Sequence, residues 1–308
     1  MRLIDLTMPI WEGAGYGEIL PMPNTPVRFV EYMAYDRHGL RMTRLKLDDE
    51  TGSPFMTPLQ GSPYRKDPLA TNPLYKWKLD EIPLDQLVLR DTVVLDVPGE
   101  DGHVITEEEI DTAIGNADYR DGDEILVRTG WGSTEKAYEL HDDYCVKSPS
   151  WSYEACVRMA EIMERRNSKI IMTDCALIMT PAYQGYGWSV GEERMVPRPK
   201  PWPSAEARER MMDLPPGTFS PAPPSIGRGG YRNLVAKTMA ICKCLVDANL
   251  LKQTRIQMII LPMLISRGGA SLPVRMIAST GVMIITPRFD IQKLIQARRL
   301  EIRSSATA

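Results

Sequence analysis

The centre of the chain alternates strongly apolar segments with segments that carry helix-start signals. The apolar segments cover residues 92–97, 124–131 and 169–174, and their length and aliphatic composition predict buried strands. The helical segments, 106–115 and 153–166, lie between those strands. This alternation predicts an α/β domain with mixed strand directions, because each element must bury its apolar face against another layer.

Both helix starts carry side chains that can satisfy free backbone N–H groups. Thr106 precedes three glutamates and Glu109 stands three residues after it, which forms a capping box with acids in the first turn. Ser152 is the expected cap of the second helix. That helix has an apolar stripe for a buried face, formed by Ala155, Met159, Ile162 and Met163.

Further strands flank this centre. They are expected at residues 1–10, 27–33, 41–47, 256–265 and 282–285. Residues 267–275 contain two glycines and a proline, and we expect them to form a turn that leads into 276–278. Residues 231–251 fit either a helix–strand–helix unit or one long helix, and residues 290–303 form an amphipathic segment.

A proline-rich segment interrupts this pattern at about residues 181–230. Prolines alternate between Pro197 and Pro203, and proline pairs follow at Pro215-Pro216 and Pro223-Pro224. Alternating prolines favour polyproline II and exclude a regular helix or a central strand. We therefore expect a single domain over residues 1–308 that carries this segment as a surface excursion.

The charge balance and the cysteine pattern restrict the partners. The formal net charge is -3, with 43% hydrophobic and 25% charged residues, which is typical of soluble globular proteins. Without a basic excess, nucleic acid is not an expected partner. No signal-like start or membrane-spanning run is present, so we expect a cytoplasmic protein without membrane contacts. The five cysteines form no CxxC pair, which predicts reduced thiols.

Residues 47–60 combine acids, hydroxyl residues, a glycine and two prolines directly after a predicted strand. This composition predicts a rigid, polar reversal of the chain. Three acids are consecutive in it: Asp48, Asp49 and Glu50. By composition alone they are solvated loop acids. If Glu50 is buried instead, its raised pKa suits it to proton transfer.

Several short motifs, taken in order along the chain, resemble a known family. They are Ile4-Asp5-Leu6-Thr7 with Pro9-Ile10, Val93 to Val97, Ile105-Thr106, Gly122-Asp123 before Val127 to Trp131, Asp174, Leu261-Pro262, and the run from Gly268 to Ala278. This ordered set resembles the cyclase family that includes kynurenine formamidase and isatin hydrolase. The resemblance implies a swivelling β/β/α fold with a mixed sheet and flanking helices. It also implies a homodimer or homotetramer that hydrolyses a small amide or lactam.

Members of that family carry the motif HxGTHxDxPxH, in which two histidines and the aspartate hold zinc or manganese. The matching window here is residues 50–60, and Gly52, Ser53 and Pro58 keep its backbone-forming part. The histidine positions hold Glu50, Pro54 and Gln60, and the aspartate position holds Met56. Proline has no side-chain donor and methionine suits only soft ions. Neither a metal nor another cofactor is therefore expected.

The resemblance also places Tyr231 or Arg232 where the family has a histidine on a helix, and Lys243 where it has a glutamate at the end of a strand. It implies a rebuilt site in which Glu50 moves protons and Lys243 stabilises negative charge, with Tyr231 as a third catalytic residue. The residues expected to contact the substrate are Ser53, Thr57, Gln60, Tyr64 and Trp77. In the alternative reading, Lys243 is a surface lysine, the hydroxyls form turns and the aromatic rings are core.

Three functions from different classes are open at this point. The first is a metal-independent enzyme that cyclises, dehydrates, isomerises or eliminates from a small, planar or cyclic substrate. The second is a kynurenine formamidase-like amide or lactam hydrolase with a relocated metal site. The third is a non-catalytic binding protein or partner subunit. We favour the first, because without a Lewis acid amide hydrolysis is harder than simple acid–base chemistry.

Overall fold

The computed structural model describes residues 2–11, 27–58, 78–140, 144, 147–176, 178, 186–189, 192–197, 233–263 and 271–281. The predicted strand at 282–285 and the amphipathic segment at 290–303 lie outside these residues. Within the proline-rich segment, the description is limited to the backbone of β10 (Tyr186–Ser189) and β11 (Glu192–Pro197), which pair as an antiparallel hairpin separate from the main sheet.

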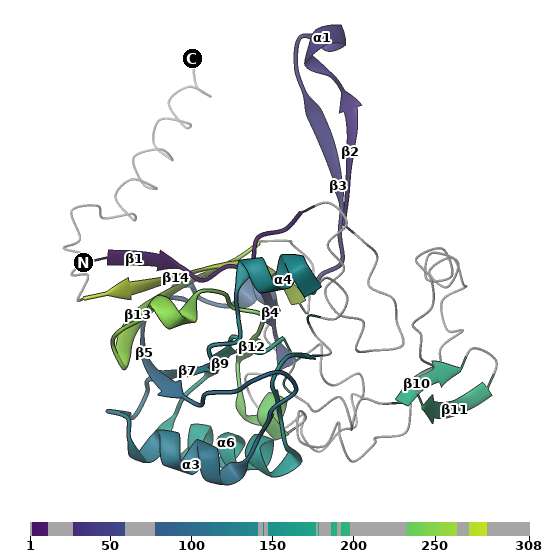
Figure 1. Cartoon of the computed structure of the whole chain (residues 1–308). Helices are drawn as coiled ribbons and strands as arrows, with labels where there is room; N and C mark the ends of the chain where they lie inside the picture. The colour runs from purple at the N-terminus through teal and green to yellow at the C-terminus, as the bar shows by residue number, and fades with distance from the viewer. Residues whose placement is uncertain are drawn as a thin grey trace, which may run out of the picture.

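A closed sheet forms the body of the molecule (Figure 1). Among the described residues, seven strands close into a ring in the order β14-β13-β5-β7-β9-β12-β4, and β4 pairs back onto β14. An eighth strand, β1, extends the sheet beyond β14. The strands are β1 (Arg2–Asp5), β4 (Pro54–Met56), β5 (Val88–Asp96), β7 (Glu124–Arg128), β9 (Ile170–Thr173), β12 (Ala240–Cys242), β13 (Arg255–Pro262) and β14 (Ser271–Thr280).

Strand direction changes around the ring. β5, β7, β9 and β12 are parallel neighbours, whereas β13, β14 and β4 pair in antiparallel fashion. The predicted α/β class with mixed strand directions is therefore confirmed. Long connections are needed between parallel strands, and they carry helices α3 (Glu107–Gly115) and α6 (Tyr153–Arg166).

Alternate side chains of each parallel strand enter two different cores. Val93, Leu95 and Ile125 belong to a cluster that includes the buried faces of α3 and α6. Val94 and Leu126 belong to a second cluster, to which every strand of the closed sheet contributes. Because neighbouring strand residues point to opposite faces, the second cluster fills the inside of the ring and the first lies under the helices. Buried apolar surface on both faces explains the continuous aliphatic runs in the sequence.

The predicted caps are present at both helices. The Thr106 hydroxyl accepts a hydrogen bond from Glu109 N at 3.3 Å, and the Glu109 carboxylate accepts one from Thr106 N at 2.8 Å. The Ser152 hydroxyl accepts from Ala155 N at 3.0 Å. None of the helices in the described ranges is both long and apolar enough to cross a membrane.

The final third of the chain tests two predictions made from the sequence. The turn expected at 267–275 is wrong from Ser271 onward, because β14 begins there. Leu272, Val274 and Met276 alternate into the core, and this burial outweighs the strand-breaking tendency of Pro273. Residues 231–251 are not one long helix, since helical residues 233–237 precede β12 and the 3-10 turn η5 (Ala248–Leu250) follows it.

Smaller elements surround the ring. The strands expected at 27–33 and 41–47 are present as β2 (Arg28–Met33) and β3 (Met42–Lys46). They form a separate antiparallel hairpin with the short helix α1 (Tyr35–His38) at its tip. β6 (Val104–Ile105) and β8 (Ser150–Trp151) pair in parallel. The remaining short helices are η3 (Leu79–Glu81), η4 (Leu84–Gln86) and α4 (Thr134–Leu140).

The segment after β12 crosses the turn at Gly132 in direct contact. Asp247 N donates a hydrogen bond to Gly132 O at 3.0 Å. A Cβ atom on Gly132 would overlap the carbonyl oxygen of Leu245 and lie 2.8 Å from Asp174 Cβ. Only glycine therefore fits this crossing.

We predict that Gly132→Ala lowers the free energy of unfolding by roughly 3 kcal/mol, because backbone atoms must move to admit the methyl group. Gly115→Ala is the matched control, since a Cβ there meets nothing within 4 Å. The control should gain up to about 1 kcal/mol, because alanine favours the helix that Gly115 ends. Urea unfolding of both variants measures the difference, and equal stabilities would contradict the close crossing.

Candidate functional site

The loop between the hairpin and β4 folds into a tight turn. Asp48 N donates to the Thr51 hydroxyl at 3.1 Å, and Thr51 N donates to Asp48 O at 3.1 Å. Gly52 follows in the left-handed region, with φ of 74°. A Cβ on Gly52 would lie 3.0 Å from Ile10 Cγ1 and 3.3 Å from Met8 O. Backbone geometry and space both require glycine here, which confirms the predicted rigid reversal of the chain.

Ser53 ties this loop to two other segments. Its hydroxyl accepts a hydrogen bond from Met8 N at 2.8 Å and donates one to Cys244 O at 2.9 Å, and its own carbonyl accepts from Val274 N. The side chain is fully buried. Ser53 therefore holds the loop in place, and the substrate contact expected for it stays a prediction. Thr57, the next expected contact, is also buried, just beyond β4.

Lys243 enters the same region from the far end of the chain. It directly follows β12, at the end-of-strand position that the resemblance implies. The next residue, Cys244, adopts a left-handed φ of 57°, and its N–H donates to Cys175 O at 2.9 Å. This conformation is uncommon for a residue with a side chain. The chain therefore changes direction directly after Lys243.

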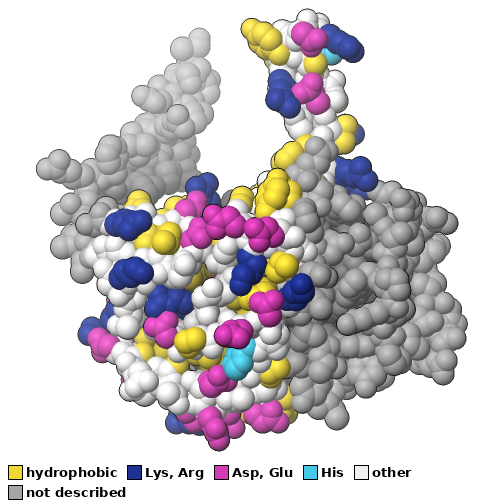
Figure 2. Space-filling model, in the orientation of Figure 1, with side chains coloured by type: hydrophobic (Ala, Val, Ile, Leu, Met, Phe, Trp, Pro, Cys, Tyr) yellow, Lys and Arg dark blue, Asp and Glu magenta, His cyan; other side chains and the backbone are white. Residues whose placement is uncertain are grey.

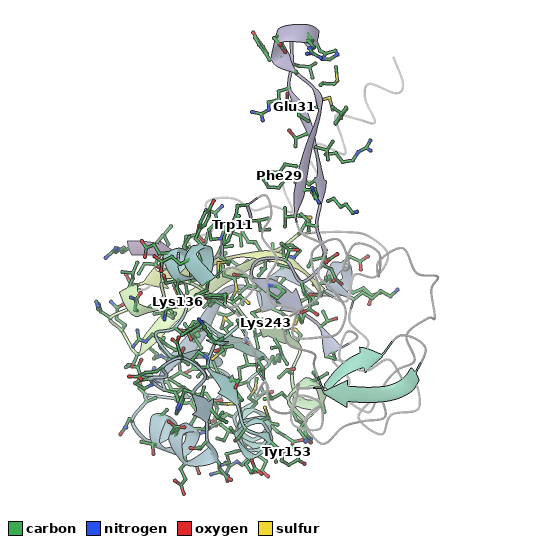
Figure 3. All side chains as sticks on the ribbon, turned by 45° about the vertical axis from the view of Figure 1, so that its right-hand side comes forward. Trp11, Phe29, Glu31, Lys136, Tyr153 and Lys243 are labelled. Atoms are coloured by element: carbon green, nitrogen blue, oxygen red, sulfur yellow. The ribbon has the colours of Figure 1, made fainter. Side chains whose placement is uncertain are left out.

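The two main predicted catalytic residues lie in contact. Lys243 Nζ donates to Glu50 Oε2 at 2.8 Å, across 193 residues of sequence. The side chains are 18% and 26% exposed, respectively. Figure 3 places Lys243 within the body, well below the projecting hairpin. The alternative readings of a fully solvated loop acid and a surface lysine are therefore excluded, while the catalytic roles stay predictions.

The acids beside this pair perturb one another. Asp49 is exposed, but its carboxyl group is partly withdrawn from water. This partial desolvation, followed by the negative charges of Glu50 and Asp48, raises the pKa of Asp49 above its ordinary value of 3.8. The Ser271 hydroxyl donates to the backbone carbonyl of Asp49 at 3.2 Å, which joins the acidic turn to the start of β14. The site thus holds one ammonium group and a run of three acids, and the pKa of Asp49 lies above that of an ordinary aspartate.

The side chains at the metal positions of the family motif do not fit a metal. Pro54 has no donor atom, and Met56 is buried in β4 between β12 and β14. Glu50, the one hard donor of the set that the structure describes, is bonded to the Lys243 ammonium. In the described ranges, no three His, Cys, Asp or Glu side chains gather as metal ligands do. A zinc or manganese ion needs three or more protein donors of this kind.

Four of the residues expected at the site cannot be placed relative to Glu50 and Lys243. Gln60, Tyr64, Trp77 and Tyr231 lie outside the described residues. Trp131 is a buried core residue, and Lys136 Nζ lies 3.7 Å from the centre of its ring.

Arg275, in the late motif, contributes to packing between strands. Its guanidinium pairs with the Asp5 carboxylate at 2.5 Å, which links β14 to β1. Cys242 and Cys244 are both buried, and burial raises the pKa of the Cys242 thiol. A buried thiol of this kind is not suited to nucleophilic catalysis.

Asp174 supports the site in a way that the sequence reasoning missed. Its carboxylate accepts hydrogen bonds at 2.8 Å from Thr129 N, the Thr129 hydroxyl and Gly130 N. Full burial raises its pKa, and these donors oppose that shift. The carboxylate thereby holds the turn that includes Gly132 in place. The segment after Lys243 contacts this turn through the hydrogen bond from Asp247 N to Gly132 O. One feature of the sequence could have indicated this role: Asp174 is an acid directly after a predicted buried strand, and it is one of the motifs that resemble the family.

We predict that Ser53→Ala lowers the free energy of unfolding by about 1–3 kcal/mol, because it leaves a buried N–H and a buried carbonyl without their partner. Ser150→Ala is the control. Ser150 is also fully buried, but its hydroxyl has no hydrogen-bond partner in the described part of the structure. The control should be neutral or slightly stabilising in denaturant titrations. A loss as large as that of Ser53→Ala would refute the distinction.

We predict that Asp49→Asn stabilises the protein at pH 7. A carboxyl whose pKa is raised by folding disfavours the folded state once the pH rises above its ordinary value of 3.8 and through the folded pKa. The gain should therefore vanish towards pH 3. Asp5→Asn should show the opposite sign at pH 7, because Thr7 and Arg275 outweigh burial and lower the pKa of Asp5. Urea midpoints against pH measure both, and a pH-independent effect of Asp49→Asn would contradict the raised pKa.

Comparisons with solved structures show the fold that this geometry belongs to. Isatin hydrolase A from Labrenzia aggregata superposes with a TM-score of 0.59 at 18% identity, over 90% of this chain and 93% of that one. Isatin hydrolase A from Ralstonia solanacearum gives 0.58 at 16% identity, over 90% and 91%. A structure described as a predicted metal-dependent hydrolase from Bacillus stearothermophilus gives 0.54 at 16% identity, over 90% and 97%.

A comparison of the sequence with protein families is more specific. None of the curated proteins matches this chain. The Cyclase family model matches residues 4–178, which is more than half of the sequence and includes the whole Glu50 loop. The structural neighbours include isatin hydrolases and a protein described as a metal-dependent hydrolase with cyclase activity. The chain therefore belongs to the Cyclase family.

Proposed function

We propose that this protein is a small-molecule enzyme in which the Glu50–Lys243 pair carries out acid–base chemistry without a metal ion. The observation that carries the proposal is the 2.8 Å contact between the two side chains. Glu50 stands at the first histidine position of the family motif, and the pair combines a proton acceptor with a cationic hydrogen-bond donor. Both groups keep some exposure, so a substrate can reach them.

In the proposed reaction, Glu50 removes a proton from the substrate, and the electron pair left behind moves onto a neighbouring carbonyl oxygen. The Lys243 ammonium donates a hydrogen bond to that oxygen as its negative charge develops. The proton then returns to another atom of the substrate or to its leaving group. Cyclisation, dehydration, isomerisation and elimination all use this sequence of transfers.

The ion pair must open when the substrate binds, which costs the energy of the contact between Lys243 and Glu50. Because both side chains are mostly buried, opening the pair without a new partner costs more than the about 0–1 kcal/mol of a solvent-exposed pair. A substrate that offers Lys243 an oxyanion regains that energy. Glu50 is then released to act as a base at the moment when Lys243 has a new partner.

A second candidate is hydrolysis of a small amide or lactam. Structural neighbours with the names isatin hydrolase and metal-dependent hydrolase favour it. In this case a metal would have to bind at ligands other than those of the family motif, since Pro54 and Met56 do not fit. Stoichiometric zinc or manganese in the purified protein, together with complete loss of turnover on chelation, would support this candidate over the first.

We predict that Glu50→Gln and Lys243→Met each lower kcat by at least about 100-fold, in line with the usual contribution of a general acid or base. The double variant should be little worse than either single variant, because the two groups act as a unit. The assay is the loss or gain of water by small cyclic and open-chain hydroxy acids that carry an acidic C–H next to a carbonyl group, in the presence of a chelator.

A second ion pair of the same chemistry provides the matched control. Lys237 Nζ lies 2.5 Å from Glu164 Oε1, and both side chains are more exposed than those of the site. Lys237→Met and Glu164→Gln should keep kcat within about twofold. If the site variants keep the same activity as these controls, or no compound is turned over or bound, the proposal is wrong.

A further inference from the structure

The four residues after Lys243 hold an unfavourable backbone conformation. Cys244 and Asp247, at the two ends of this segment, both have a left-handed φ of 57°. A residue with a side chain keeps such a conformation only where the surrounding structure enforces it, and residues of this kind gather at functional sites. Each N–H group of residues 244–247 donates to a carbonyl oxygen of another segment, at 2.9–3.2 Å. The acceptors are, in order, Cys175, Thr173, Leu6 and Gly132.

Three of these four acceptors surround one residue, Asp174. β9 ends at Thr173, directly before Asp174, and Cys175 directly follows it, so two acceptors are its neighbours in the chain. The third, Gly132, packs against it, because a Cβ on Gly132 would lie 2.8 Å from Asp174 Cβ. The position of Asp174 therefore determines where three of the contacts to the segment lie.

The Asp174 carboxylate fixes this arrangement. Its oxygens accept three hydrogen bonds at 2.8 Å, two from Thr129 and one from Gly130 N. Hydrogen bonds to an ionised carboxylate are stronger than those between neutral groups. All three donors belong to the turn that ends at Gly132, whose carbonyl accepts from Asp247 N at 3.0 Å. The carboxylate thus joins this turn to the end of β9, and both hold the segment after Lys243.

We propose that Asp174 is a positioning residue, which holds Lys243 where its ammonium group meets Glu50. This inference rests on the proposed function, because it concerns the same site. The Asp174 side chain is fully buried and bonded to the turn, so it acts through Lys243 and not on the substrate. Lys243 is proposed to stabilise charge that develops in the transition state. Its misplacement therefore lowers kcat and has little effect on KM.

A second buried acid separates this role from a purely structural one. Asp and Glu side chains are spread among Lys and Arg over the visible surface of the body (Figure 2), whereas Asp174 and Glu124 are buried. The Glu124 carboxylate accepts hydrogen bonds from Lys169 N at 2.8 Å and Ile170 N at 2.6 Å, at the start of β9. Because β12 runs parallel to β9, Lys243 lies at the Asp174 end. Glu124 is therefore the matched control.

Asp174→Asn keeps the shape of the side chain but turns an amide NH2 group towards one of its hydrogen-bond donors. We expect it to lower kcat at least about 10-fold and to change KM by less than about threefold. Glu124→Gln should also lower the urea midpoint, because it too loses a buried charged acceptor, but keep kcat within about twofold. Added to Lys243→Met, Asp174→Asn should lower kcat no further, since the residue that it positions is gone.

Thr129→Val is a milder variant that decides the question if Asp174→Asn does not fold. It removes the hydroxyl donor and keeps both backbone donors to the carboxylate. It should lower kcat by a smaller factor than Asp174→Asn. Thr129→Ser keeps the hydroxyl group and should restore the wild-type kcat.

The position of Lys243 is also measured without a substrate, as the rate at which acetic anhydride labels each lysine, read by mass spectrometry. Lys237 is the internal reference, since it is also paired with a carboxylate and lies far from the site in the sheet; its side chain is 40% exposed, against 18% for Lys243. Asp174→Asn should raise the labelling of Lys243 relative to Lys237 at least about threefold, because the segment then opens more often. Glu124→Gln should leave the ratio unchanged.

Unchanged labelling of Lys243 in the folded variants of Asp174 and Thr129 overturns the proposal, whether or not a substrate is turned over. An active wild type whose kcat falls as far with Glu124→Gln as with Asp174→Asn overturns it as well. A wild type without turnover whose labelling changes as expected overturns the proposed function instead, and supports the placement of Lys243 by Asp174.

Discussion

Closure of the sheet by β4 is the constraint on which the rest of the structure depends. This three-residue strand pairs with β12 on one side and β14 on the other, so it joins the parallel and antiparallel parts of the ring. Its position determines where the preceding loop lies, and β12 determines where Lys243 lies. The contact between Glu50 and Lys243 is thus a product of barrel closure, supported by Ser53, whose hydroxyl binds backbone groups of both neighbouring segments.

In the proposed function, one kind of positive charge takes the place of another. The family resemblance implies a divalent cation held by hard donors, whereas here Pro54 and Met56 stand at two of the ligand positions and an ammonium group contacts Glu50. An ammonium is a hydrogen-bond donor and a point charge, but it cannot activate water as a metal does. This difference explains why acid–base chemistry suits the pair better than hydrolysis.

Local signals in the sequence predicted local structure well. The caps at Thr106 and Ser152 and the apolar stripe of the second helix each depend on residues within a few positions. The strand from Ser271 was missed because Pro273 and the preceding glycines suggested a turn, and burial across the sheet decided otherwise. No spacing rule links Glu50 to Lys243; only the family resemblance suggested a common site. Asp174 was noted, but its hydrogen bonds to the neighbouring turn depend on tertiary structure.

The central claim is that the Lys243 ammonium takes the place of the metal beside Glu50. Anomalous diffraction from crystals soaked in zinc or manganese chloride, recorded at the absorption edge of each metal, tests it most directly. The account predicts no anomalous peak within bonding distance of Glu50, and Lys243 Nζ in contact with its carboxylate. A strong peak bonded to Glu50, with Lys243 displaced, would contradict it.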